Sequence, residues 1–269
     1  MLKDITFGQY FDSGSVLHRL DPRTKLLLLI LAVVFFFIAG NMYALFLAAA
    51  FTIMVLSLSR VPIKMYLKNI KAVWLIIVFT AVINIFYGTG GEVLFSWWKL
   101  TVTTGGISRA AFMAGRIMLL ILISSVLTYT TTPNDLTDAI ESLLSPLKFI
   151  GLGTVVHTLA MMMTIALRFI PTLVEETEKI MNAQKARGAD LENGKLKERI
   201  RALIPILVPL LISSVRRAYE LAEAMECRCY NGGVGRVKMK RLRFGKGDIA
   251  AAAVSVLFCG LVITLNILF

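Results

Sequence analysis

The longest charge-free stretch of the chain covers residues 26–59 and reads LLLLILAVVFFFIAGNMYALFLAAAFTIMVLSLS. A helix that crosses the hydrocarbon core of a bilayer needs about 20 mainly apolar residues, with a range of roughly 17–25. The stretch is long enough for two short helices, and Gly40 and Asn41 break it near its middle. It therefore predicts a membrane hairpin with spans at Leu26–Ala39 and Tyr43–Ser59.

Three further apolar stretches predict spans at about Ala72–Tyr87, Ile107–Thr130 and Ile249–Phe269. The composition agrees, because 57% of the 269 residues are apolar and the mean hydropathy is +0.74, against roughly 45–50% apolar residues in a soluble domain. We expect an all-α integral membrane protein with about five transmembrane helices plus long amphipathic cytosolic coupling helices.

The charges of the chain predict its orientation in the membrane. The net charge is +12, and basic residues cluster beside the spans, above all in the loop that holds Arg60, Lys64, Lys68 and Lys71. Such clusters mark cytosolic loops and favour a membrane protein over a nucleic-acid binder. The next loop holds the aromatic pair Trp97–Trp98, typical of the outer interface. We expect a multi-pass membrane protein, with the N-terminus cytosolic and the C-terminus outside.

The region between the fourth and fifth spans is more polar. We expect three parts: a four-helix transmembrane part at 1–130, a cytosolic or interfacial coupling part at 131–246, and a C-terminal transmembrane helix at 247–269. Within the coupling part, the apolar run Leu203–Val215 is short, is interrupted by prolines and has basic residues on both sides. It is predicted to lie along or dip into the inner face of the membrane. The run Thr154–Ile170 stays ambiguous between a membrane span and a helix at the inner face.

These two segments resemble a diverged internal repeat. Each has an apolar first half, then a proline, then a polar helix that ends on an arginine: Pro171 before Arg187, and Pro209 before Arg228. At ~1.5 Å per residue, each arginine would stand roughly 24–28 Å along the helix from its proline. Arg168, Pro171 and Pro209 are the candidate hinge residues of the coupling helices.

Arg187 is expected at a helix C-terminus, with Gly188 as the left-handed residue that follows. One interpretation is purely structural, since a cation at this end stabilises a helix by about 0.3–1 kcal/mol. The other is functional: a planar guanidinium inserted into an acidic groove of a partner, with the small neighbours Ala186 and Gly188 allowing close approach. The sequence leaves both open.

Arg228 repeats this arrangement between Cys227 and Cys229. A zinc site built on Cys-x-Cys is disfavoured, because a structural site needs about four ligands and the sequence offers no nearby His or Cys to complete one. The thiols are expected to act as small packing residues. The candidate docking residues are therefore Arg187, Arg228, Ala186, Gly188, Cys227 and Cys229, with no metal and no cofactor.

No catalytic motif is found in the sequence. There is no phosphate-binding loop, so the chain is not expected to bind ATP, and neither a zinc-protease nor a serine-hydrolase motif occurs. Arg116 lies within an apolar run and has no evident partner, whereas His18 and His157 are expected to be isolated packing residues. The chain is predicted not to be an enzyme.

Several motifs together resemble one family: Leu20–Lys25 (LDPRTK), Thr130–Pro133 (TTTP), Arg168–Pro171 (RFIP), Ala183–Gly188 (AQKARG) and Ala224–Tyr230 (AMECRCY). On these residues the chain is similar to the transmembrane coupling subunit, or T component, of energy-coupling factor transporters. These ATP-driven importers take up vitamins or metal ions. The motifs extend over nearly the whole length, and the two arginine motifs are the most specific.

The resemblance implies a subunit that joins two cytosolic ABC-type ATPases to a small substrate-binding membrane protein, the S component. It implies that Arg187 and Arg228 dock into the two ATPases, and that closure of the ATPase pair moves the coupling helices and tips the S component. The second motif departs from the family pattern Ala-Arg-Gly, because it reads Cys-Arg-Cys and so keeps only the charge.

Two other functions agree less well with the sequence. A pore-forming permease of a conventional ABC transporter would show polar residues on facing spans, and these spans are nearly bare of them. A membrane-embedded lipid enzyme would need clustered acidic or nucleophilic groups, for which only Asp135 and Asp138 are available, on a predicted helix-capping turn.

Overall fold

The structure is a computed structural model, and it describes residues 10–87, 90, 92–97, 100–151, 153–189, 196–232, 242 and 244–268. Their contacts divide them into two compact units. We call the first, Gly8–Ala139 with Lys240–Phe269, the membrane unit, and the second, Ile140–Met239, the coupling unit. The predicted domain boundaries at 130 and 246 stay predictions.

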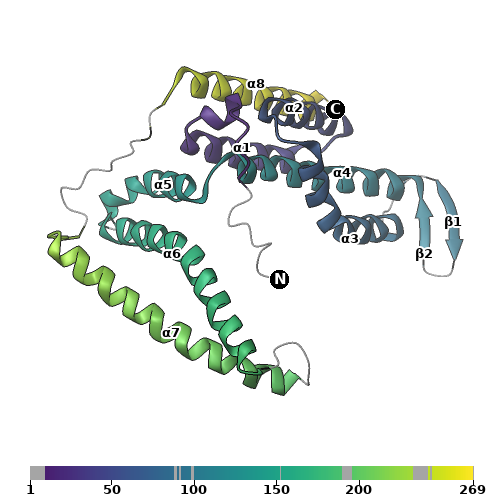
Figure 1. The fold of residues 1–269 in the computed structure, drawn as a ribbon. Helices are drawn as coiled ribbons and strands as arrows, with labels where there is room; N and C mark the ends of the chain where they lie inside the picture. The colour runs from purple at the N-terminus through teal and green to yellow at the C-terminus, as the bar shows by residue number, and fades with distance from the viewer. Residues whose placement is uncertain are drawn as a thin grey trace. The chain divides into compact units, whose positions relative to one another are not determined.

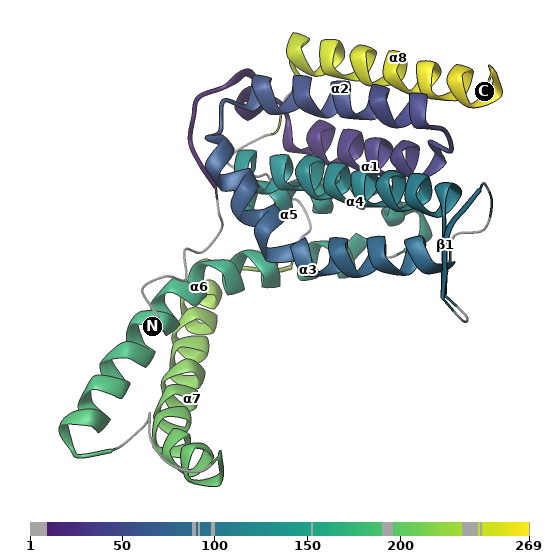
Figure 2. The same ribbon diagram turned by 90° about the vertical axis from the view of Figure 1, so that its right-hand side faces the viewer.

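The membrane unit is built on five long helices: α1 (Pro22–Ile38), α2 (Met42–Ser59), α3 (Ile63–Tyr87), α4 (Thr104–Thr130) and α8 (Lys246–Leu268). They lie side by side in Figures 1 and 2. Their core contains Phe36, Ile123, Phe258 and Val262, and the rings of Phe51 and Phe258 stack at 4.3 Å. Buried alanines, such as Ala44 and Ala48, let α2 pack closely against its neighbours, as is usual between membrane helices.

The ends of α1 and α4 are set by local capping. Asp21 is the N-cap of α1, where its Oδ1 accepts a hydrogen bond of 2.9 Å from the Arg23 N–H, and Pro22 occupies the first helical position. The motif at 21–25 is thus a helix start, as expected. Thr103 caps α4 by accepting a hydrogen bond of 3.0 Å from the Gly106 N–H.

A short antiparallel hairpin of β1 (Val93–Trp97) and β2 (Leu100–Thr103) connects α3 to α4. The sequence analysis predicted only a loop here. The β-branched residues of 100–103 and the pairing with β1 explain the strands, but so short a run gives no clear alternation. Trp98, of the predicted interfacial pair, lies outside the described residues.

Within the described residues, six helices are long and apolar enough to cross a membrane: α2, α3 within Ile63–Phe86, α4, α6 (Gly153–Ala186), α7 within Arg201–Cys227, and α8. α1 has 17 residues, which corresponds to about 26 Å of helix, close to the ~30 Å of a bilayer core. Large apolar side chains on α3, such as Trp74, Leu75 and Phe79, are exposed, as expected for a face that meets lipid. The all-α membrane fold is confirmed.

The chain passes from the membrane unit into the coupling unit through α5 (Pro133–Leu143) and the 3₁₀ helix η2 (Ser145–Ile150). The start of α5 is a reciprocal cap: the Thr132 hydroxyl accepts a hydrogen bond of 3.2 Å from the Asp135 N–H and donates one of 2.9 Å to the Asp135 carboxylate. The predicted capping turn is confirmed.

The coupling unit is a hairpin of two long helices, α6 (Gly153–Ala186) and α7 (Leu196–Cys227). Pro171 lies inside α6, and Pro205 and Pro209 lie inside α7. Pro205 and Pro209, which interrupt the apolar run in the sequence, do not interrupt the helix, because α7 continues through both. Figure 1 shows α6 changing direction along its length, the usual response of a helix to an internal proline.

Candidate docking ends of α6 and α7

Helix α6 ends in a Schellman motif. Gly188 has a positive φ of 87°, and its N–H donates to the Lys185 carbonyl at 3.0 Å. The N–H of Ala189 donates to the Gln184 carbonyl, also at 3.0 Å. These two bonds satisfy carbonyls that the end of a helix would otherwise leave without partners. The predicted role of Gly188 as the left-handed residue is confirmed, and Arg187 is the last residue before it.

Helix α7 ends in the same way, with a cysteine in place of the glycine. The Cys229 N–H donates to the Glu226 carbonyl at 2.8 Å, and the Tyr230 N–H donates to the Met225 carbonyl at 3.0 Å. Cys229 has a φ of 54°, in the left-handed region that a side chain disfavours. Arg228 therefore occupies the same position in its motif as Arg187 does in the first.

Both arginines are exposed, as are Ala186, Gly188, Cys227 and Cys229. Among the described residues, neither guanidinium has a hydrogen-bond or ion-pair partner. Each projects from the negative end of a helix and can make two parallel hydrogen bonds to a carboxylate. The geometry thus presents two equivalent cationic tips. It does not separate docking from simple helix stabilisation, so their docking role stays a prediction.

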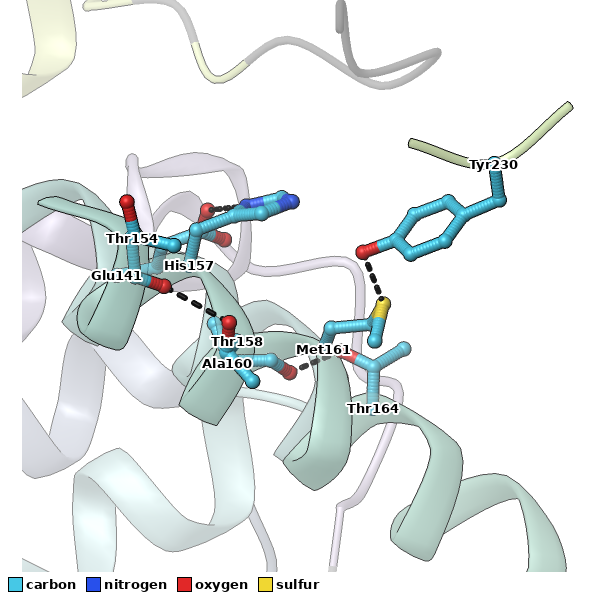
Figure 3. A network of polar contacts seen from close by, with 8 residues as sticks. All are labelled: Glu141, Thr154, His157, Thr158, Ala160, Met161, Thr164 and Tyr230. Carbon is cyan, nitrogen blue, oxygen red and sulfur yellow. Dashed lines mark hydrogen bonds and ion pairs between the residues drawn. The ribbon is translucent and has the colours of Figure 1, made fainter. Parts of the chain in front are cut away.

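The two tips belong to opposite ends of the hairpin. Near the first, the Gln184 amide donates to the Pro205 carbonyl at 3.4 Å. From Pro205 to Arg228, α7 rises by roughly 35 Å at ~1.5 Å per residue. Near the second, the Tyr230 hydroxyl donates to the Met161 sulfur, in the third turn of the opposite helix, at 2.9 Å (Figure 3). The tips can therefore serve two separate partners.

A polar cluster holds the middle of the hairpin. The Glu176 carboxylate accepts hydrogen bonds from the Ser213 hydroxyl and from the Arg217 guanidinium, the latter at 2.8 Å. Beside it, an apolar cavity of about 240 Å³ separates α6 from α7, lined in part by Phe169, Leu173 and Leu221. The sequence analysis did not find this cluster, because its partners are far apart along the chain.

The candidate hinge residues are all exposed: Arg168 and Pro171 lie on α6 and Pro209 on α7. Pro209 lacks an N–H, so the Pro205 carbonyl has no intrahelical donor, and Gln184 supplies one from the opposite helix. The hinge role of these residues stays a prediction.

Arg116 and His157 have partners that could not be predicted from the sequence. The Arg116 guanidinium donates to the Ala39 carbonyl at the end of α1 and lies 4.6 Å from the centre of the Phe112 ring. His157, expected to be isolated, pairs with Glu141 of α5 at 3.1 Å (Figure 3). The His18 Nε2–H donates to the Phe11 carbonyl at 2.7 Å, and its Nδ1 lies 2.7 Å from the Ser15 hydroxyl, with which it shares a hydrogen bond, as a polar packing residue does.

Cys227 and Cys229 offer no complete metal site within the part of the chain that the structure describes, where no group of three His, Cys, Asp or Glu side chains comes together. The thiols flank Arg228 on an exposed helix end.

The helices, the long amphipathic hairpin and its paired arginine ends together define a multi-pass, all-α membrane protein of the transporter-subunit class. The family model described as cobalt transport protein (CbiQ) matches residues 13–240, and the chain belongs to this family.

Relatives at about half identity extend over the whole length. The chain is 49% identical over 269 residues to the energy-coupling factor transporter transmembrane protein EcfT of Ruminiclostridium cellulolyticum, with 100% of both chains covered. It is 50% identical to the protein of that name from Brevibacillus brevis, with 96% of each covered, and 47% identical to that from Bacillus subtilis, with 90% of this chain and 91% of the relative covered. The resemblance stated from the motifs is confirmed: the chain is an energy-coupling transmembrane subunit of this transporter type.

Proposed function

We propose that this chain joins two cytosolic ABC-type ATPases to a substrate-binding membrane subunit, and that Arg187 and Arg228 each dock into one ATPase. The observation that carries the proposal is the equivalence of the two helix ends. Two helices of one hairpin end in the same hydrogen-bonding motif, each with an exposed arginine immediately before the left-handed residue.

The chemistry of the tips supports docking into an acidic groove. A guanidinium at a helix end presents a fixed fork of donors, and its pairing with a carboxylate is stronger and more directional than that of a lysine. The 34-residue α6 and the 32-residue α7 are stiff enough to carry displacement at their tips along their length. ATP-driven approach of the two ATPases would thus move both helices of the coupling unit.

The proposal also includes an orientation and a substrate class. The arginine tips need to face the cytosol, where ATP is hydrolysed, which agrees with a cytosolic N-terminus and an outer C-terminus. The substrate is proposed to be a vitamin or a metal ion, captured by the partner membrane subunit, while ATP hydrolysis takes place in the ATPases. This chain itself is proposed to be non-catalytic.

The alternative of a pore-forming permease fits the membrane unit less well. A cavity of about 300 Å³ lies among α1, α2, α4 and α8, and the only polar side chains in its lining are Lys25, Thr130 and Ser255. A path for a hydrophilic substrate needs hydrogen-bonding groups along its length. We therefore place substrate capture in a partner.

The test is the assembly of charge-reversal variants. Arg187→Glu and Arg228→Glu should each weaken association with the ATPases by about 2 kcal/mol or more, which is roughly 30-fold, as loss of a central arginine anchor does. The double variant should lose both ATPases and all uptake. Arg216→Glu, an exposed arginine on α7, is the matched control and should retain both. Retention of a full ATPase complement by the double variant would refute the docking role.

A further inference from the structure

Two buried polar contacts fasten the start of α1 to the end of α4 and to the start of α8, the long helices of the membrane unit that come before and after the coupling unit in the chain. After α4 the chain runs through Thr131 into α5, within which it leaves the membrane unit after Ala139, and it returns at Lys240, shortly before α8. The motifs at Leu20–Lys25 and Thr130–Pro133, to which the docking function assigns no role, meet at this place.

The first contact holds the end of α4. The Lys25 ammonium donates to the Thr130 carbonyl at 2.9 Å and to the His18 carbonyl at 3.4 Å. Lys25 is only 9% exposed, although the sequence suggested an ordinary basic residue flanking a span. Carbonyls of the last helical turn lack intrahelical donors and form the negative end of the helix dipole. The lysine therefore caps α4 from the neighbouring helix.

The second contact holds the beginning of α8. The Asp248 carboxylate accepts a hydrogen bond of 2.9 Å from the Asp21 N–H through Oδ1, and one of 2.7 Å from the Gly245 N–H through Oδ2. Asp248 is 5% exposed. One carboxylate thus bonds to the N-termini of α1 and α8 at once, where the positive ends of both helix dipoles favour it.

We call the two contacts made by Lys25 and Asp248 the joint. The joint contains more charged groups than packing alone requires. The negative charges of three carboxylates attract the buried positive charge of Lys25; they belong to Asp135, Asp248 and Asp21. Burial of charged groups costs free energy, and well-packed apolar residues often give a stability equal to or greater than that of a buried ion cluster. Directional contacts of this kind instead fix the relative positions of the elements that they join.

We propose that Lys25 and Asp248 are positioning residues that transmit displacement of the coupling unit to the membrane helices; this inference rests on the proposed function. The outgoing connection to the coupling unit starts at the end of α4, which Lys25 contacts, and the returning connection ends at the start of α8, which Asp248 contacts. Lys25 holds the outgoing connection to α1, and Asp248 holds the returning one to the same helix. When these contacts are removed, the connections can move while α1 stays in place, and work done on the coupling unit is lost.

The test compares ATP hydrolysis with uptake in the complete complex, reconstituted in vesicles. Lys25→Met keeps the length of the side chain and removes its donor. We expect this variant to co-purify with both ATPases and to hydrolyse ATP within twofold of the wild type, while uptake falls at least tenfold. Lys25→Arg, which restores a donor to the Thr130 carbonyl, should recover uptake. The matched control Lys68→Met changes an exposed lysine of α3 and should alter neither rate.

Two results would overturn the inference: unchanged uptake in Lys25→Met, or parallel loss of assembly, hydrolysis and uptake, which is the signature of a merely structural residue. Asp248→Asn, which keeps one acceptor oxygen, is the milder second variant, and uptake should fall for it while hydrolysis stays. If Lys25→Met does not fold, Asp248→Asn takes its place: loss of uptake with hydrolysis retained supports the inference, and unchanged uptake or a parallel loss of all three properties overturns it.

A second readout separates this inference from the docking proposal, because it needs no ATPase. In the purified full chain, hydrogen exchange of the amides at 131–136 and 245–250 should be at least fivefold faster in Lys25→Met or Asp248→Asn, with exchange in α6 and α7 unchanged. Failure of the wild type to bind ATPases would sink the docking proposal alone. Unchanged exchange at both connections would sink the joint.

Discussion

At the scale of single residues, the two helix ends differ at one position. Gly188 and Cys229 both have positive φ, but only glycine adopts this conformation without a steric penalty. A side chain in the left-handed region costs about 1–2 kcal/mol. The end of α7 therefore keeps the hydrogen-bonding motif of the end of α6, but the backbone conformation of Cys229 destabilises it locally.

We accordingly predict that Cys229→Gly tightens the end of α7. The gain of about 1 kcal/mol corresponds to a roughly fivefold slower hydrogen exchange at the Cys229 position and at Tyr230, whose amides are bonded to Glu226 and Met225. Cys227→Ala, in the preceding helical turn, is the control and should leave this exchange unchanged. Faster exchange in Cys229→Gly would show that the cysteine stabilises the motif.

Arg116 gives a second prediction at this scale. Its guanidinium caps the Ala39 carbonyl, so Arg116→Met leaves the end of α1 without that donor. We expect the free energy of unfolding to fall by about 1–3 kcal/mol, measured by denaturation in detergent. Arg109→Met, an exposed arginine earlier on α4, should change it by less than about 0.5 kcal/mol. Equal effects of the two substitutions would contradict the capping role.

At the scale of elements, the position of a helix could be predicted where the length of an apolar run alone determines it. The spans of α2 and α8 follow from charge-free runs, and that of α4 follows from an apolar run that holds only Arg109 and Arg116, whereas α3 begins nine residues before its predicted start at Ala72. Its first turns carry Lys64, Lys68 and Lys71, which were assigned to a loop because charge usually ends a span. Lys64 and Lys68 are exposed on a helix that continues past the apolar stretch.

The continuity of α7 through its prolines could not be predicted, because a residue on another helix offsets part of the free energy that a proline costs inside a helix. A proline inside a helix costs about 3 kcal/mol and argues for a break. Here the carbonyl that Pro209 leaves free receives the Gln184 amide from α6. Sequence spacing shows neither this contact nor the ties of Lys25 and Asp248, which join residues more than a hundred positions apart.

This contact predicts a coupling between two substitutions. In Pro209→Ala the alanine N–H can bond to the Pro205 carbonyl, so Gln184→Ala should then cost less than it does in the wild type. A double-mutant cycle on the free energy of unfolding should give an interaction of about 0.5–1.5 kcal/mol. Strict additivity would show that the Gln184 amide does not serve the Pro205 carbonyl.

At the scale of the whole molecule, the chain combines an apolar helical membrane unit with a hairpin that presents two cations far apart. The membrane fold and the two arginine ends could be predicted, since both follow from local sequence. The contacts that hold α6 to α7, and α1 to α4 and α8, could not. Under the proposed function, these contacts are the ones that carry displacement of the tips to the membrane helices.

The most direct test of the central claim is cross-linking from the two tips in native membranes. A photoreactive residue is placed at Ala186 or at Cys227, exposed neighbours that leave Arg187 and Arg228 intact. The account predicts that each position cross-links to an ATPase subunit, and that a probe at Arg216 does not. Absence of ATPase cross-links from both tips, in membranes where the ATPases co-purify with the chain, would contradict it.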